Sequence, residues 1–102
     1  MTYETDAAWT ALADRTRRAI VMKLAEGERA VGELAEVLPV SQPAVSQHLK
    51  VLADLGLVSQ RAEGTKRIYR LNQAGVVALR DQLDAFWKRT MSGFEDLMEE
   101  ER

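Results

Sequence analysis

Residues 41–52 read Ser-Gln-Pro-Ala-Val-Ser-Gln-His-Leu-Lys-Val-Leu, and this stretch decides the fold of the 102-residue chain. Ser41 is a strong helix N-cap, and Pro43 is tolerated in the first turn, where backbone amides have no helical partner. Gly56 follows as an expected left-handed terminator. The apolar residues recur at spacings of four and three: Val45, Leu49 and Leu52. The stretch therefore predicts a helix with one buried and one polar face.

A second, shorter helix is predicted immediately before this one, over Val31 to about Leu38. Pro39 ends it, because a proline pushes the residue before it out of helical geometry. A turn as short as Leu38–Ser41 sets two helices across each other and leaves the second free to enter a DNA major groove. We place this helix-turn-helix at about residues 31–55.

Two strands are predicted after the helix-turn-helix, Leu57–Ala62 and Lys66–Leu71. Residues 63–65 (Glu-Gly-Thr) make a tight turn, so the strands form an antiparallel hairpin at about residues 57–71. A helix-turn-helix followed by a hairpin is a winged helix-turn-helix. We therefore predict a single domain over residues 1–102, mainly α, with five helices and a two-stranded hairpin as the wing.

Two further helices are predicted at the start of the chain. The segment Ala7–Ala13 carries Trp9 and Leu12 on one side. Asp14 is the expected N-cap of the next helix, which ends before Gly27.

The polar face of the helix over residues 41–54 has the composition of a DNA-reading surface. Gln suits the paired acceptor and donor of adenine, Ser suits several base edges, and Lys suits guanine or a phosphate. No carboxylate, which phosphates would repel, precedes Asp54 on this face. An ordinary solvated helix face would also be polar, and the hairpin that follows favours DNA contact.

The DNA-binding candidates on this helix are Ser41, Gln42, Pro43, Ser46, Gln47 and Lys50. In the wing, Arg61, Lys66 and Arg67 are the candidates for contact with phosphates or the minor groove. We expect His48, at the edge of the apolar face, to pack or hydrogen-bond there rather than to act as a switch.

A long final helix is predicted over about residues 73–99, with Asn72 as its N-cap. Its apolar residues recur at threes and fours over about seven turns, more than a domain this small covers. A two-fold dimer through the first and last helices would cover them; the alternative is a last helix folded back onto its own domain. The expected dimer-interface residues are Trp9, Leu83, Phe86, Trp87, Phe94 and Leu97.

The composition excludes several classes of protein. Hydrophobic residues make up 46% and charged residues 29%, so neither disorder nor a fibre is expected. No apolar run approaches the roughly 20 residues of a membrane span, and the acidic start Met1–Asp6 is unlike a secretory signal, so we expect a cytoplasmic protein. The absence of cysteine excludes disulfides and thiolate chemistry, and one histidine without an acid–base partner leaves no catalytic site.

The net charge of −2 and the isoelectric point of about 5.4 are unusual for a protein that binds DNA. The charge is uneven along the chain, however. Residues 41–71 carry five basic and two acidic residues, a balance of +3, whereas the segments before and after carry −2 and −3. A basic middle between acidic flanks makes a local positive surface that the net charge hides.

Several motifs together resemble the ArsR-type winged-helix repressors over nearly the whole chain. They are Leu12–Arg18, Val31–Ala35, Ser41–Leu52, Gly56–Val58, Glu63–Gly64 and Tyr69–Leu71. The ending Leu-Asp-Ala-Phe-Trp, residues 83–87, is similar to a cysteine-free branch of that family. The resemblance implies a bacterial homodimeric repressor that binds inverted-repeat operators, and many such proteins leave DNA when a metal or another signal arrives.

The sequence departs from the metal sites of that family. Ala30–Ala35 lacks the cysteines of the arsenic and cadmium/lead sensors, and the last helix lacks the histidines of the zinc-type site. The possible metal ligands on that helix are all carboxylates: Asp81, Asp84, Glu95, Asp96 and Glu99. Carboxylates alone are poor ligands for soft or borderline metals, so we expect no metal and no cofactor. Carboxylates that meet across a dimer axis are the one open route to a metal site.

Together these patterns predict a sequence-specific DNA-binding transcriptional regulator and not an enzyme. We expect a homodimeric repressor whose recognition helices lie about 34 Å apart on an inverted repeat in double-stranded DNA. The alternative is a winged-helix protein-interaction module that does not bind DNA; the acidic ends favour it, and the carboxylate-free reading face opposes it. A small-molecule effector is compatible with the cysteine-free branch.

Overall fold

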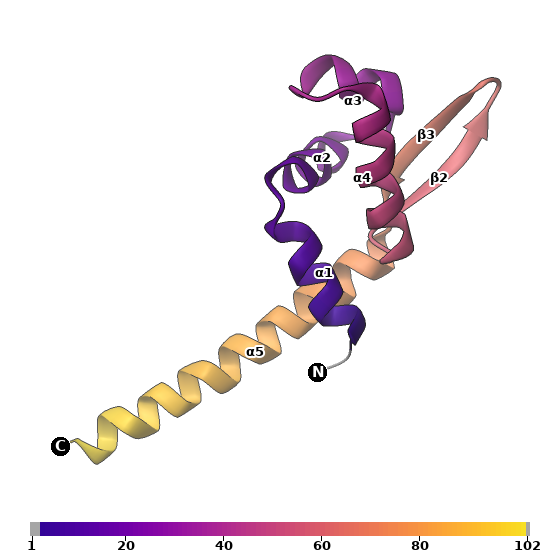
Figure 1. Cartoon of the computed structure of the whole chain (residues 1–102). Helices are drawn as coiled ribbons and strands as arrows, with labels where there is room; N and C mark the ends of the chain where they lie inside the picture. Colours follow the sequence, from indigo (N-terminus) through magenta and orange to yellow (C-terminus); the bar gives the residue numbers. More distant parts are fainter. Residues whose placement is uncertain (1–2, 102) are drawn as a thin grey trace.

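Five helices and three short strands form the chain over residues 3–101, the part that this computed structural model describes (Figure 1). The helices are α1 (Tyr3–Ala13), α2 (Arg15–Glu26), α3 (Val31–Val37), α4 (Gln42–Asp54) and α5 (Gln73–Glu100). The strands are β1 (Arg29–Ala30), β2 (Val58–Glu63) and β3 (Lys66–Leu71). The predicted fold class, a mainly α winged helix-turn-helix, is confirmed.

The core lies where α2, α3 and α4 pack their apolar faces together. The largest fully buried side chains are Ile20, Leu34, Val45, Leu49 and Leu52. Three of them are the apolar positions predicted for α4, and Leu57, Val58 and Tyr69 add to the same core. Burying one such aliphatic side chain stabilises a fold by about 1.5–3 kcal/mol. This packing therefore holds α4 in place with its polar face outward.

Side-chain caps begin two helices where the sequence predicts them. The Asp14 carboxylate accepts a hydrogen bond from the backbone N–H of Arg17 at 3.0 Å, and the Ser41 hydroxyl accepts one from the N–H of Ala44 at 3.3 Å. The first of these bonds lowers the pKa of the Asp14 carboxyl below its ordinary value of 3.8. Each cap satisfies an amide that has no partner within its helix.

The sheet contains three antiparallel strands in the order β1-β3-β2. The sequence predicted only the two strands of the hairpin and missed β1. In β1, Arg29 pairs with Tyr69 and Ala30 pairs with Ile68. Two residues are too short to carry an alternating pattern, and their partners lie far along the chain, so the sequence does not reveal this strand. The N–H of Ala30 also donates to Glu33 Oε1 at 3.0 Å, which fixes the start of α3.

The wing hairpin consists of β2 and β3, and only Gly64 and Thr65 separate them. Gly64 has a φ of 62°, in the left-handed region that glycine adopts without strain. The strand β2 begins at Val58, one residue later than predicted. Lys66 and Arg67 directly follow the turn and therefore lie at the tip of the wing.

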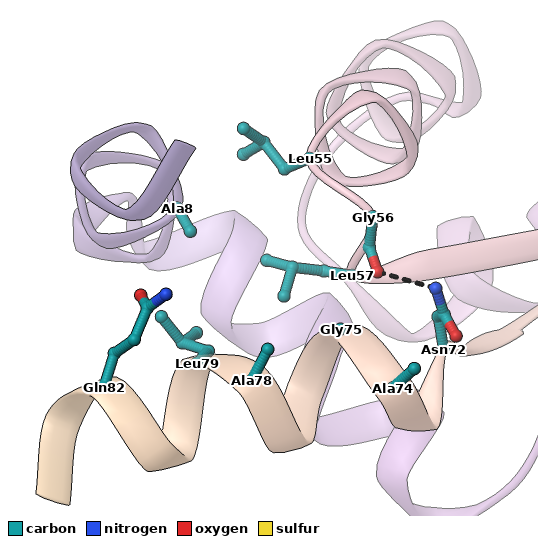
Figure 2. Close-up of a pocket in the computed structure, with 10 residues that line it drawn as sticks. All are labelled: Ala8, Leu55, Gly56, Leu57, Asn72, Ala74, Gly75, Ala78, Leu79 and Gln82. Carbon is teal, nitrogen blue, oxygen red and sulfur yellow. Dashed lines mark hydrogen bonds between the residues drawn. The ribbon is translucent and has the colours of Figure 1, made fainter. Parts of the chain in front are cut away.

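The start of α5 lies against the corner between α4 and β2 (Figure 2). Asn72 occupies the predicted N-cap position, but its side-chain amide donates to the carbonyl oxygen of Gly56 at 2.9 Å instead of capping α5. Gly75 packs so closely against Gly56 that a Cβ atom there would overlap the same oxygen. Beside this corner lies a pocket of about 340 Å³, and Ala8 of α1 and Ala78 of α5 are among its small lining residues.

Beyond this corner, α5 extends away from the rest of the chain (Figure 1). The structure describes all 28 residues of the helix, and none of them is buried. At 1.5 Å per residue the helix is about 42 Å long, and the molecule measures 64 × 26 × 24 Å. The alternative in which the last helix folds back onto its own domain is therefore wrong for this chain.

Candidate nucleic-acid interface

The outer face of α4, with its N-cap Ser41, carries the predicted DNA-binding residues of this helix. All six are exposed: Ser41, Gln42, Pro43, Ser46, Gln47 and Lys50. Val45 and Leu49, on the opposite side of the same helix, are fully buried. Within α4 no carboxylate precedes Asp54, which is also exposed. The helix thus presents a polar and basic surface that is free of negative charge over its first three turns.

A hollow of about 470 Å³ lies between the start of α4, α3 and the wing tip. Gln42 and Ser46 line it on one side, and Lys66 and Arg67 line it on the other. Residues that lie 20 to 25 positions apart in the sequence are therefore neighbours across one concave surface. Four of the nine predicted DNA-binding residues meet here, whereas Gln47 and Lys50 lie on the exposed face of α4 beside it.

The hollow also contains two carboxylates that the sequence prediction did not assign to the interface, Glu33 and Glu36 of α3. Glu33 is occupied by its hydrogen bond to the N–H of Ala30. Arg67 donates through Nη1 to Gln60 Oε1 at 3.0 Å, which holds its guanidinium along the wing. For Lys66 the part of the chain that the structure describes offers no ion pair within 4.0 Å, so its ammonium group is available to a ligand.

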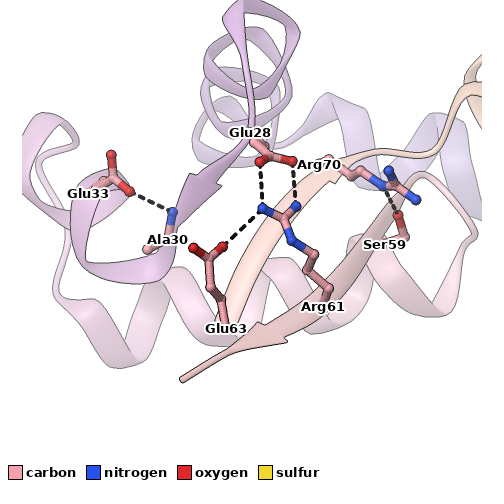
Figure 3. A network of polar contacts seen from close by, with 7 residues as sticks. All are labelled: Glu28, Ala30, Glu33, Ser59, Arg61, Glu63 and Arg70. Atoms are coloured by element: carbon pink, nitrogen blue, oxygen red, sulfur yellow. Dashed lines mark hydrogen bonds and ion pairs between the residues drawn. The ribbon is translucent and has the colours of Figure 1, made fainter. Parts of the chain in front are cut away.

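Arg61 differs from the other two basic wing candidates because carboxylates already surround its guanidinium. It contacts both carboxylate oxygens of Glu28, at 2.6 and 2.7 Å, and Glu63 at 3.0 Å (Figure 3). These bonds raise the pKa of Arg61 further and lower that of Glu28. Contact of Arg61 with DNA stays a prediction. The sequence gives no sign of Glu28 as a partner, because 33 residues separate the two.

His48 contributes a hydrogen bond at the edge of α4. Arg17 of α2 donates through Nε to His48 Nδ1 at 3.1 Å, so the expectation of a hydrogen-bonding histidine is confirmed. The bond links α2 to the recognition helix beside the reading face.

The outer part of α5 presents a continuous apolar face to solvent. Six of its side chains are 47–57% exposed: Phe86, Trp87, Met91, Phe94, Leu97 and Met98. Four of them belong to the predicted dimer interface. The other two residues of that predicted interface, Trp9 and Leu83, are half-buried. Met91 and Met98 complete the face. The rings of Phe86 and Trp87 contact each other edge to face, with centroids 5.4 Å apart.

Among residues 7–101, whose side chains the structure describes, no group of three or more Asp, Glu, His or Cys residues is placed to hold a metal ion. The absence of a metal site stays a prediction. None of the described helices is long and apolar enough to span a membrane.

Two comparisons with known proteins decide the family. The family model described as bacterial regulatory protein, arsR family, matches residues 14–60. The HTH-type transcriptional regulator Rv2034 of Mycobacterium tuberculosis is 58% identical over 96 residues, which cover 94% of this chain and 90% of that protein. This chain belongs to the ArsR family.

Further ArsR relatives agree with the fold and the function. The arsenical resistance operon repressor of Bacillus subtilis is 39% identical over 70 residues, covering 68% of this chain and 67% of the repressor. The solved structure of an ArsR-like transcriptional regulator from Rhodococcus sp. RHA1 superposes with a TM-score of 0.73 at 29% identity, covering 92% of each chain. These relatives are named as regulators or repressors of transcription, not as enzymes. The chain is thus a DNA-binding transcriptional regulator of the ArsR family.

Proposed function

We propose that this ArsR-family regulator is a homodimeric repressor that binds an inverted-repeat operator in double-stranded DNA. The observation that carries the proposal is the exposed, carboxylate-free face of α4, held outward by a fully buried opposite face. Its start shares a hollow with the basic wing tip. A helix that enters the major groove while a basic wing lies against the backbone is the arrangement by which such folds read DNA.

The side chains of this face divide into two roles. Gln42, Ser46 and Gln47 are uncharged donors and acceptors, and in the proposed complex they contact base edges. Lys50 and the wing-tip residues Lys66 and Arg67 contact phosphates. Ser41 caps α4 and lies with Pro43 at its first turn, next to the backbone of the operator.

The second subunit is required because one helix-turn-helix with its wing contacts few phosphates, and the net charge of −2 on the chain opposes binding to DNA. The apolar face of α5, with Trp9 of α1, is the proposed dimer interface. A two-fold axis through it gives two recognition helices about 34 Å apart, one turn of DNA. The regulator acts in the cytoplasm, where its DNA lies, and has no catalytic activity.

The test is a selection of duplexes from a random-sequence library by the wild-type protein, followed by gel shifts. The expected result is an enriched inverted repeat bound by two protomers, with half-sites one helical turn apart. A scrambled duplex of the same composition should bind more weakly, and its affinity should fall steeply as salt rises. Enrichment of no sequence and equal, feeble binding to both duplexes would indicate a protein-interaction module instead.

A further inference from the structure

The ion pair between Glu28 and Arg61 joins the two edges of the sheet. Glu28 lies between the end of α2 and β1, whereas Arg61 lies in β2. The strand order is β1-β3-β2, so the edge strands lie about 10 Å apart with no backbone hydrogen bond between them. The guanidinium of Arg61 crosses this distance over β3 and contacts both carboxylate oxygens of Glu28, at 2.6 and 2.7 Å (Figure 3).

The backbone holds the wing only weakly to the body of the molecule. β1 pairs with just two residues of β3, Tyr69 and Ile68. Towards the tip, from Glu63 to Lys66, the wing is paired only within its own hairpin. Glu28, by contrast, lies two positions after the end of α2 and directly before β1, so it belongs to the body. The ion pair therefore attaches the middle of the wing to the body, in addition to the core packing of Val58 and Tyr69 at the base of the wing.

The geometry of this attachment is unusual for a surface ion pair. Single exposed pairs contribute little, because two flexible side chains must be ordered in water. Here the planar guanidinium engages one carboxylate through two parallel bonds and also Glu63 at 3.0 Å, the arrangement in which arginine differs from lysine.

Basic residues outnumber acidic ones on this face of the sheet, because alternation along β3 places Lys66 there as well. Arg61 and Arg70 face Glu28 and Glu63, and Arg70 donates to the Ser59 hydroxyl at 3.3 Å (Figure 3). Arg67 belongs to the opposite face because side chains alternate along β3. It is that opposite face, with the wing tip, that borders the hollow containing Gln42 and Ser46.

We propose that Glu28 and Arg61 are positioning residues for DNA binding, a role that rests on the proposed function. Their ion pair sets the angle of the wing so that Lys66 and Arg67 stay opposite the start of α4 across the hollow. Arg61 then acts through the wing and does not itself contact phosphate. A direct phosphate contact by Arg61, restrained by Glu28, is the competing role.

Three variants separate these roles in gel shifts with the enriched and scrambled duplexes at two salt concentrations. Glu28→Gln removes the carboxylate and so breaks the ion pair. Arg61→Lys keeps the positive charge but loses the two parallel hydrogen bonds of the guanidinium. The double variant Glu28→Arg with Arg61→Glu rebuilds the ion pair with the two residues exchanged. We expect each single variant to weaken binding to the enriched duplex about three- to tenfold, with the salt slope unchanged. The swap should restore binding to within about twofold. Arg70→Gln, also exposed on this face, is the control and should leave binding unchanged.

Other outcomes overturn the inference. If Glu28→Gln tightens binding to both duplexes while the swap abolishes it, Arg61 is a phosphate contact. If no variant changes binding, the ion pair has no role in positioning the wing. Thermal unfolding of each variant checks that these exposed changes leave the body folded, and Arg61→Lys is the mildest of them. Wild-type protein that binds neither duplex would instead overturn the proposed function, and this inference with it.

Discussion

Helices α4 and α5 have the same kind of sequence pattern and opposite surroundings. In each of them apolar residues recur at spacings of three and four along one face. In α4 these residues, Val45, Leu49 and Leu52, are fully buried against α2, α3 and the sheet. In α5, by contrast, no residue is buried, and Trp87, Phe94 and their neighbours are about half exposed.

The difference shows what an amphipathic pattern does and does not specify. It specifies that a helix has an apolar face, but the cover for that face comes from elsewhere. For α4 the cover lies in the same chain, and the polar face is left for a ligand. For the outer part of α5 the described chain supplies no cover, and a contiguous apolar patch of this kind marks an interaction surface.

The largest expected effect comes from removing the apolar face of α5. Leu83→Asp with Trp87→Lys should give a monomer that retains its helix-turn-helix, because neither side chain belongs to the fully buried core. Binding to the enriched duplex should fall by more than about 100-fold, since the second half-site is no longer engaged from the same particle. Sedimentation reports the assembly state and a gel shift the affinity.

The matched control exchanges charges on the polar side of the same helix, Asp81→Lys with Lys88→Asp, which also leaves the net charge unchanged. It should sediment as a dimer and bind like the wild type. A Leu83/Trp87 double variant that still sediments as a dimer, or a true monomer that binds almost as well, would argue against the proposed interface.

Truncation of one leucine in each helix sharpens the comparison. Leu49→Ala opens a cavity in the core of a single chain and should lower the free energy of unfolding by about 2–5 kcal/mol at every protein concentration. Leu97→Ala, in the exposed face of α5, should act only through dimerisation, so its effect should depend on protein concentration. Urea unfolding at two concentrations distinguishes the two, and an equal, concentration-independent loss would contradict the contrast.

A smaller effect is expected on the exposed face of α4. Gln47→Ala should cost about 1–3 kcal/mol on the enriched duplex and little on the scrambled one, because a base contact is lost. Lys50→Ala should weaken both duplexes and flatten the salt dependence, since a phosphate contact is lost instead. Titrations at two salt concentrations measure both. If Gln47→Ala weakened the two duplexes equally, this residue would not read bases.

The smallest expected effect is a pH dependence of the stability of the body, which comes from the ion pair between Glu28 and Arg61 and does not involve α5. The hydrogen bonds from Arg61 lower the pKa of Glu28 below its ordinary value of 4.5. The unfolded chain therefore takes up this proton first as pH falls. The stabilisation is complete above pH 4.5 and is lost as pH falls through the folded-state pKa. Thermal unfolding should thus separate wild type from Glu28→Gln most at pH 6–7, and the difference should shrink as pH falls below 4.5. A difference that did not change as pH fell below 4.5 would have another cause.

Local sequence patterns predicted the helices that form and support the helix-turn-helix, and where these helices begin. Ser41 begins α4 through its hydroxyl and Asp14 begins α2 through its carboxylate, because each cap needs only the next turn of the same helix. The six exposed residues of α4 follow from the helix period in the same way. Asn72, however, donates to Gly56 rather than capping α5, because a corner 16 residues away approaches it.

The sequence by itself determined the order of the five helices and the hairpin, the apolar faces of the helices and the turn at Gly64, because hydrogen bonds and backbone strain between near neighbours decide them. Only the tertiary structure decided that Arg29 and Ala30 form a third strand and that Arg61 pairs with Glu28. It also decided that Lys66 and Gln42 meet across one hollow and that α5 leaves the body. Strand pairing, ion pairing and burial depend on which distant segments lie within a few ångströms, and packing of the whole chain sets those distances.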